Sequence, residues 1–281
     1  MFMRSMSQSL KEKSGKRKNK SLRFIGGLAV ILLAAAALGA ALVLSKTVRI
    51  NPYFAEKYQV HGIDVSHYQG DICWEKIREQ DIDFAFIKAT EGSGHLDERF
   101  QENWEESAMA GIPAGAYHFF SFDSPGKNQA EWYITNVGSL EGRLIPAVDV
   151  EFYGNKEADP PQKAEVVREL KAFLDRLEDE YQARPVIYTT YKVYELYILG
   201  EFEEYPLWIR NVYYPPDVDM KGKWDFWQYT DRAVMDGYQG EEKYIDKNVF
   251  CGDEEEMKKG FCSAVSTYRL QGPFSVPNYK F

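Results

Sequence analysis

Two carboxylic acids separated by one residue, Asp149 and Glu151, follow the apolar run Ile145–Val148. If this run is a strand, residues i and i+2 point to the same face, so both acids project together while Val150 turns away. Their mutual repulsion and partial burial raise the pKa of one acid, which then stays protonated beside an ionised partner. Cleavage of a glycosidic bond requires this pairing. Strand-end acids also serve as turn residues, helix caps or structural ion pairs, so the pair alone does not define a site.

Two further acids stand at comparable positions. Asp64 lies near the end of the expected strand Val60–Val65, and Asp246 lies in the late segment Tyr244–Phe250. In α/β barrels the catalytic groups lie at the C-terminal ends of the strands. We therefore expect these acids to gather at one end of a barrel, although they are far apart in the sequence.

Short apolar runs without polar alternation, which are typical of strands buried on both faces, recur along the chain. The expected strands are Val60–Val65, Phe84–Lys88, Ile112–Phe120, Leu144–Val150, Pro185–Thr189, Leu207–Arg210 and Asp225–Tyr229. Helical patterns separate several of them, at Arg99–Ala110, from the cap Ser124-Pro125 to about Val137, and at Pro161–Tyr181. This alternation predicts an α/β fold with a parallel sheet, closed as a single TIM-like (β/α) barrel. We expect the barrel to be irregular, with fewer than eight helices. No GxGxxG follows the first strand, so a dinucleotide fingerprint is lacking.

Five sequence blocks resemble glycoside hydrolase family 25, the muramidase-type lysozymes, and they occur in the order of that family. In this chain they read HGIDVSHYQG at 61–70, FAFIKATEG at 84–92, AGAYHFF at 114–120, PAVDVE at 146–151 and DKNVF at 246–250. The resemblance covers about residues 59–251.

The resemblance implies a catalytic site and a substrate. Glu151 matches the general acid/base and Asp149 the carboxylate beside it, while Asp64 and Asp246 match two further acids that line the site. The implied activity is hydrolysis of the β-1,4 bond between N-acetylmuramic acid and N-acetylglucosamine in peptidoglycan, without a cofactor or a metal. The chain departs from the family after Ile209, where Arg210 replaces a residue that is usually small.

The resemblance leaves two routes open for the face of the sugar opposite Glu151. Asp149 attacks directly as a nucleophile, or the substrate's own 2-acetamido carbonyl attacks while Asp149 stabilises the cyclic cation. In both routes Glu151 protonates the leaving oxygen and then acts as a base toward water.

Sugar rings pack their C–H faces on aromatic side chains, so aromatic and polar residues near the strand ends are candidates for substrate binding. These candidates are Lys88, Glu91, Tyr117, Tyr188, Trp208, Gln228 and Tyr229. Core packing explains an aromatic side chain in a barrel more often than contact with a sugar does, and a core ion pair explains Lys88 with Glu91 as well as contact with the substrate does. The four histidines form no metal-binding spacing, and no GxSxG motif indicates a serine hydrolase.

The N-terminal region predicts a membrane anchor. Residues 1–23 contain eight basic side chains and one acid, and the 21 residues from Phe24 to Leu44 carry no charge. A helix of that length crosses a hydrocarbon core of about 30 Å, and the positive-inside rule places residues 1–23 in the cytoplasm. A cleaved signal peptide is the alternative, since Ala34–Ala41 offers small residues for cleavage. The whole chain has a net charge of −9 although residues 1–23 are basic, so the rest of the chain is acidic. This acidic body argues against nucleic acid as a partner.

The expected organisation is a basic cytoplasmic segment (1–23), a transmembrane signal anchor (24–45), a tether (46–58), the barrel (59–255) and a C-terminal tail (256–281). The exported part then faces peptidoglycan, in the periplasm or at the cell surface. A non-catalytic peptidoglycan-binding module anchored in the membrane is the alternative function. A Cys251–Cys262 disulfide is compatible with export, but the sequence does not establish it.

Overall fold

The computed structural model describes residues 25–39, 41–42, 49–216 and 224–262. The expected cytoplasmic segment 1–23 and residues 263–281 of the expected tail lie outside these ranges. The chain divides into two compact units, residues 1–50 and 51–281. In the first unit, residues 25–39 are helical. Among the described residues, no helix combines the length and the apolar character that crossing a membrane requires.

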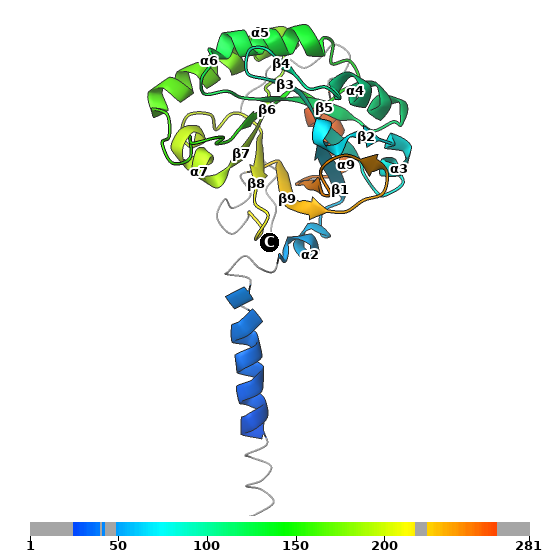
Figure 1. Cartoon of the computed structure of the whole chain (residues 1–281), viewed down its shortest axis with the longest axis vertical. Coiled ribbons are helices and arrows are strands. Elements are labelled where there is room, and N and C mark those ends of the chain that lie inside the picture. Colours follow the sequence, from blue (N-terminus) through cyan, green and yellow to red (C-terminus); the bar gives the residue numbers. More distant parts are fainter. Residues whose placement is uncertain (1–24, 40, 43–48, 217–223, 263–281) are drawn as a thin grey trace, which may run out of the picture. The chain divides into compact units, whose positions relative to one another are not determined.

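Eight strands close into a barrel in the second unit (Figure 1). Around the barrel they are β1 (Val60–Val65), β3 (Phe84–Glu91), β5 (Ala114–Phe119), β6 (Ala147–Val150), β7 (Val186–Thr190), β8 (Leu207–Arg210), β9 (Phe226–Ala233) and β11 (Ile245–Phe250). The pairing of β1 with β3 completes the ring. All seven strands expected from the apolar runs are present, β1 and β8 with the expected ends and the other five with shifted ends, and the single barrel is confirmed.

Strand β11 departs from the all-parallel sheet that the sequence indicated. It pairs antiparallel with both of its neighbours, β1 and β9. Because β11 runs in the opposite direction, its first residues lie at the same end of the barrel as the last residues of the parallel strands. This reversal places Asp246 opposite Asp64 in the register of β11 with β1.

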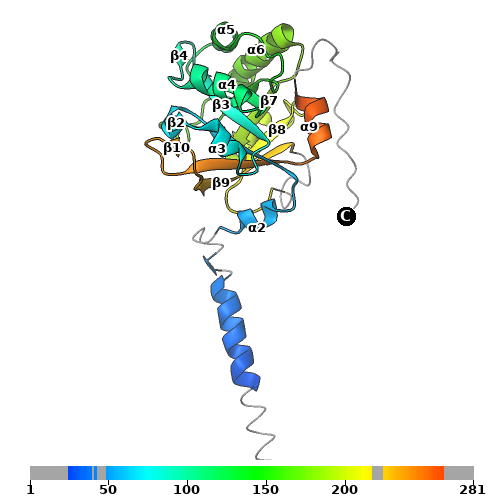
Figure 2. The ribbon, with the colours of Figure 1, turned by 90° about the vertical axis from the view of Figure 1, so that its right-hand side faces the viewer.

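Helices cover the outside of the barrel, as Figures 1 and 2 show. They are α3 (Trp74–Arg78), α4 (Phe100–Met109), α5 (Gly126–Val137), α6 (Lys163–Tyr181) and α7 (Tyr191–Val193), which continues as the π-helical turn η2 (Tyr194–Ile198). The layer is irregular, because residues 234–244 between β9 and β11 contain the short strand β10 (Tyr238–Gln239) and no helix. Two other short elements, β2 (Asp71–Ile72) and β4 (His95–Leu96), lie outside the ring.

The alternation of each strand divides its side chains between two cores. On β1, Ile63 and Val65 belong to the outer cluster beneath the helices, whereas Val60 belongs to the cluster that fills the barrel. Gly62 leaves room for the ring of Phe84 inside the barrel, since a Cβ there would lie 2.4 Å from a ring carbon. The same alternation turns Asp64 toward the barrel interior.

Helix α2 (Asn51–Ala55) lies within the expected tether 46–58, and it packs on the barrel. The Asn51 amide donates to the carbonyl oxygens of Asn211 (2.7 Å) and Tyr229 (3.1 Å). Ala55 is buried in a cluster with the outward side chains of β8, β9 and β11. The folded unit therefore begins several residues before the boundary expected at residue 59.

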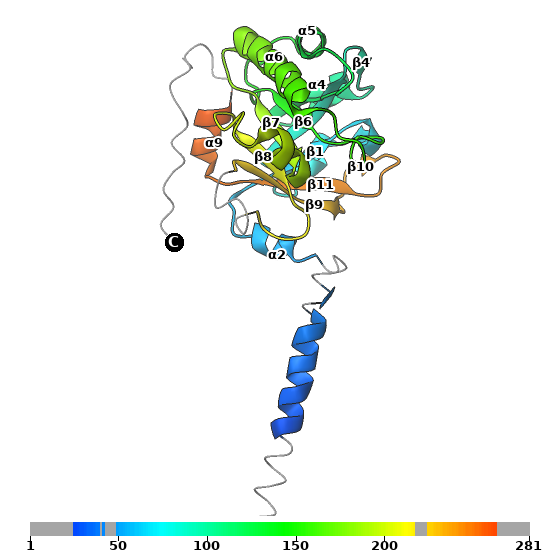
Figure 3. The same cartoon turned by 90° about the vertical axis from the view of Figure 1, so that its left-hand side faces the viewer.

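The other end of the expected barrel also differs. Helix α9 (Glu254–Phe261) extends past residue 255 and packs against the barrel (Figures 2 and 3). Its Phe261 ring lies 5.0 Å from the ring of Phe226 and 5.2 Å from that of Phe250, centre to centre. Because Phe226 begins β9 and Phe250 ends β11, α9 closes the barrel end opposite the acids. No disulfide joins Cys251 and Cys262 in the structure, so the bridge left open by the sequence is not formed.

Candidate active site

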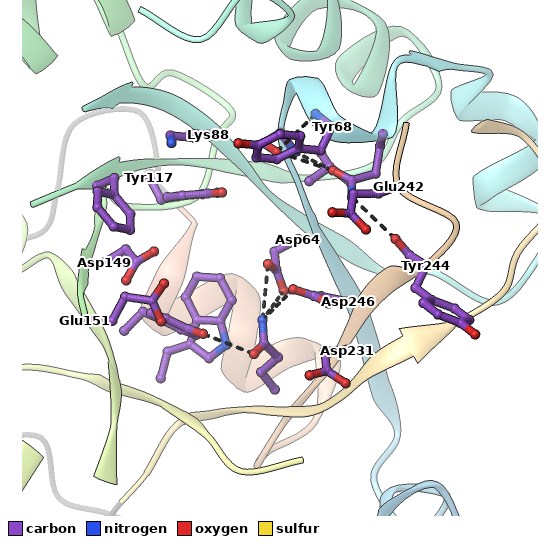
Figure 4. Close-up of a pocket in the computed structure, with 17 residues that line it drawn as sticks. Asp64, Tyr68, Lys88, Tyr117, Asp149, Glu151, Asp231, Glu242, Tyr244 and Asp246 are labelled. Carbon is purple, nitrogen blue, oxygen red and sulfur yellow. Dashed lines mark hydrogen bonds between the residues drawn. The ribbon is translucent and has the colours of Figure 1, made fainter. Parts of the chain in front are cut away.

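A cavity of about 350 Å³ opens at the C-terminal ends of the parallel strands (Figure 4). It is lined by Asp64, Val65, Ser66, Tyr68, Gln69, Lys88, Tyr117, Phe119, Asp149, Glu151, Tyr188, Trp208, Gln228, Asp231, Glu242, Tyr244 and Asp246. All four acids singled out from the sequence are among these residues. The barrel therefore gathers at one site carboxyl groups that are far apart along the chain.

Asp149 and Glu151 occupy one wall of the cavity (Figure 4). Val150 between them packs into the outer core, as the strand periodicity predicted. Burial raises the pKa of Asp149 well above its ordinary value, and the nearby charge of Glu151 raises it further. Burial also raises the pKa of Glu151, while the positive charge of Arg210 opposes that rise. Such a pair retains a proton at a pH where ordinary carboxyls are ionised.

One oxygen of Asp149 has no hydrogen-bond partner within the part of the chain that the structure describes. This atom, Oδ1, is buried, and the whole residue is only 8% exposed. A buried carboxylate oxygen without a donor is costly for a folded protein unless a ligand supplies the donor. The oxygen is thus ready to accept a hydrogen bond from a bound molecule.

Asp64 and Asp246 form a second pair, facing each other across β1 and β11. Burial and the charge of Asp64 raise the pKa of Asp246 to about 9. Burial raises the pKa of Asp64 less, because Asn248, Gln228 and Asp246 donate hydrogen bonds to it. Near neutral pH, Asp246 is therefore the protonated member, and it donates to an ionised Asp64.

Two amide side chains hold this second pair in place. Gln228 Nε2 donates to both oxygens of Asp64, at 3.2 and 3.0 Å, and to Asp246 at 3.1 Å. Asn248 Nδ2 donates to Asp64 at 2.8 Å. The Tyr188 hydroxyl and the Trp208 indole N–H fix the amides in turn, by donating to Gln228 Oε1 (3.1 Å) and Asn248 Oδ1 (2.8 Å). The acids are therefore held by a connected polar network inside the barrel.

The residues expected to bind substrate divide into two groups. Tyr117, Tyr188, Trp208, Lys88 and Gln228 line the cavity. Tyr188 and Trp208 are almost fully buried and contribute mainly through the network, whereas Tyr117 is half-buried at the cavity wall.

Glu91 and Tyr229 are not among the residues that line the cavity. Glu91 accepts a 2.8 Å hydrogen bond from the Lys88 ammonium, so it acts on the cavity only through that residue. Tyr229 packs in the cluster beneath α2. Since its neighbour Gln228 points inward, the period of two directs Tyr229 to the outside of the barrel.

One wall of the cavity was not foreseen from the sequence. Tyr68, Glu242 and Tyr244 line it and come from two distant loops (Figure 4). The pairing of β2 with β10 joins these loops, and the Glu242 N–H donates to the Tyr68 carbonyl at 3.1 Å. No local sequence signal announces such a contact, because it depends on two-residue strands.

Within the described ranges, no group of three or more His, Cys, Asp and Glu side chains is arranged to hold a metal ion. The arrangement offers instead a buried proton donor, an ionised carboxylate beside it and aromatic walls. A closed β/α barrel with paired carboxyls at the C-terminal strand ends has the construction of a glycoside hydrolase.

Comparison with known families identifies the class further. The model of glycosyl hydrolases family 25 matches residues 63–238. The chain belongs to this family. The matched segment contains Asp64, Asp149 and Glu151, and Asp246 follows shortly after its end.

Several relatives resemble this chain over most of its length. The uncharacterized protein YegX of Escherichia coli O157:H7 is 38% identical over 207 residues, covering 72% of this chain and 73% of YegX. Lysozyme M1 of Streptomyces globisporus is 32% identical over 216 residues, covering 72% and 71%. The solved structure of a family 25 glycosyl hydrolase from Bacillus anthracis is 46% identical, with a TM-score of 0.68, and the match covers 72% of this chain and 94% of that one.

Proposed function

We propose that this protein is a peptidoglycan hydrolase, a lysozyme that cleaves the β-1,4 bond between N-acetylmuramic acid and N-acetylglucosamine. The observation that carries the proposal is the buried pair Asp149 and Glu151 on one wall of the cavity. Membership of glycosyl hydrolases family 25 and the 32% identity with a lysozyme support the same substrate.

In this proposal Glu151 is the general acid. Burial raises the pKa values of both Glu151 and Asp149, and the proton that this pair retains is the one that Glu151 delivers to the leaving oxygen of the glycosidic bond. After the bond breaks, the ionised Glu151 takes a proton from the water that completes hydrolysis, so the residue returns to its starting state.

Asp149 acts on the opposite side of the reacting sugar. Its unpartnered Oδ1 is suited to accept a hydrogen bond from the 2-acetamido N–H of the substrate. That contact would orient the acetamido carbonyl for attack on the anomeric carbon, which favours the substrate-assisted route. Direct attack by Asp149 uses the same oxygen, and trapping of a glycosyl–enzyme intermediate by mass spectrometry distinguishes the two routes.

Asp64 and Asp246 have a supporting role. The protonated Asp246 and the ionised Asp64 together carry one negative charge, which stabilises a positively charged sugar in the transition state. Their network with Gln228 fixes this charge before the substrate arrives. Tyr117 and Lys88 are the proposed contacts with the substrate, and Glu91 is proposed to orient Lys88.

We further propose that residues 24–45 anchor the protein in the membrane and that the barrel faces the wall outside the cytoplasm. The uncharged 21-residue run and its basic flank support this proposal. Full-length protein is expected in the membrane fraction after a carbonate wash, whereas a chain lacking residues 1–46 is expected in the supernatant. An intact mass that corresponds to a chain starting after residue 34 would indicate a cleaved signal peptide instead.

The activity is tested on the glycan itself. Purified peptidoglycan is incubated with the protein, the products are reduced with borohydride, and the reduced ends are identified by mass spectrometry. Muramitol ends are expected with the native chain and not with Glu151→Gln. Glucosaminitol ends would indicate a glucosaminidase, and binding without new ends would indicate a non-catalytic wall-binding module.

A further inference from the structure

Arg210 occupies a position inside the barrel at the level of the acids. It follows Trp208 by two residues on β8, and Trp208 packs in the interior cluster, so Arg210 points to the same side. In the register it lies opposite Gln228 of β9 and Thr190 of β7. Its side chain is 31% exposed, which leaves the guanidinium partly shielded from water.

A rim carboxylate holds this guanidinium. Arg210 NH2 lies 2.7 Å from Asp231 Oδ2, and Asp231 lines the cavity. The second cation of the site has the same arrangement, since Lys88 Nζ lies 2.8 Å from Glu91. Each cation near the catalytic acids is therefore partly neutralised by its own carboxylate.

The charge of Arg210 reaches all four acids. It lowers the pKa of Glu151 more than any other charge there, and it also lowers the pKa values of Asp149, Asp64 and Asp246. The other charged group that lowers the pKa of both Glu151 and Asp149 is Lys88.

We propose that Arg210 is a positioning residue that sets the pH range of hydrolysis, and that Asp231 sets how much of its positive charge the catalytic carboxyls experience. The inference rests on the proposed lysozyme function and adds a regulator of the same site. A positive charge beside a carboxyl favours its ionised form, and a partner carboxylate weakens that influence. Arg210 therefore lowers the pKa of Glu151, and the charge of Asp231 makes that lowering smaller.

The groups that face Glu151 from the surrounding strands define what else shapes the pH profile. Asp149 comes from its own strand, Asp64 from β1, Lys88 from β3 and Tyr188 from β7. None of them is altered by a substitution at Arg210 or Asp231. The charge of Asp231 also raises the pKa of Asp246 directly, so opposite shifts from these two substitutions would report the net charge of the Arg210–Asp231 pair.

The experiment measures initial rates of new reducing ends from peptidoglycan between pH 3 and pH 9, with the full-length chain in mild detergent. Both limbs of the profile are expected to move about one pH unit higher in Arg210→Gln. They are expected to move lower in Asp231→Asn and to stay close to the native positions in Arg210→Lys. Arg176→Gln is the matched control, because it removes an arginine paired with Glu131 at 2.8 Å on the outer helices.

Each outcome bears on the inference. If both limbs of the pH profile stay in place while the rate falls equally at every pH, the ion pair is merely structural and the inference is wrong. The inference is also wrong if Arg210→Gln and Asp231→Asn shift the profile in the same direction. If Arg210→Gln does not fold, Asp231→Asn alone decides: a shift of both limbs to lower pH supports the inference, and no shift or a shift to higher pH overturns it. Absence of new ends from the native chain at every pH would instead refute the proposed function.

Discussion

Replacing Asp246 with asparagine is expected to change how the stability of the barrel depends on pH. In the native protein the pKa of Asp246 is about 9, against an ordinary value of 3.8. Between these values the folded chain keeps a proton that the unfolded chain has released. The contribution of this group to stability is therefore complete below about pH 4 and is lost as the pH rises through 9.

The size of this effect follows from the linkage relation. One proton corresponds to a slope of about 1.4 kcal/mol per pH unit, so the native free energy of unfolding loses about 4 kcal/mol from this group between pH 5 and pH 8. The asparagine side chain in the variant has no proton to release, and its amide still donates to Asp64. We therefore expect the free energy of unfolding of Asp246→Asn, taken relative to that of the native chain, to rise by about 4 kcal/mol between pH 5 and pH 8.

Urea unfolding followed by tryptophan fluorescence measures the difference. The chain lacks residues 1–46 in this assay, because the barrel unit begins at Asn51 and has its own core. Asp225→Asn is the matched control: the pKa of this buried acid at the opposite end of the barrel is about 6, so its slope should change only below pH 6. If the free energy of unfolding has the same dependence on pH in the native and Asp246→Asn chains between pH 5 and pH 8, Asp246 does not hold the assigned proton.

Three further substitutions, one of them with a matched control, test the packing by urea unfolding. Asn51→Ala removes two buried hydrogen bonds between α2 and the barrel and should cost about 2–3 kcal/mol; no loss would mean that α2 is a tether after all. Gly126→Ala should cost about 2–3 kcal/mol because its Cβ would lie 1.8 Å from the Glu169 carbonyl oxygen, whereas Gly94→Ala, in open space, should change stability by less than about 0.5 kcal/mol. Phe261→Ala should cost about 3–5 kcal/mol by opening the closed end of the barrel, and a neutral result would detach α9 from the core.

Much of the barrel and its four acids could be predicted from local patterns. Buried strands leave continuous apolar runs, and the i, i+2 rule placed Asp149 and Glu151 on one face with Val150 in the outer core. The same rule, applied to adjacent residues, would also have separated Gln228 from Tyr229, since neighbours on a strand face opposite sides.

Other features depend on contacts that no local pattern records. Helix α2 has five residues and joins the barrel through Asn51, a polar side chain that sequence patterns assign to the surface. The cavity wall of Tyr68 and Tyr244 requires two-residue strands from distant loops to pair. Arg210 was visible as a departure from its family, but only the register of β8 with β9 places it in the layer of the acids.

The central claim is that Glu151 delivers the proton that breaks the glycan. The most direct measurement digests peptidoglycan with the native chain or with Glu151→Gln, reduces the products with borohydride and compares the reduced ends. Circular dichroism verifies that both chains are folded. The account predicts muramitol ends from the native chain and a loss of about 10³-fold or more in the variant, since a glutamine cannot donate that proton. Muramitol ends released at similar rates by both chains would contradict it.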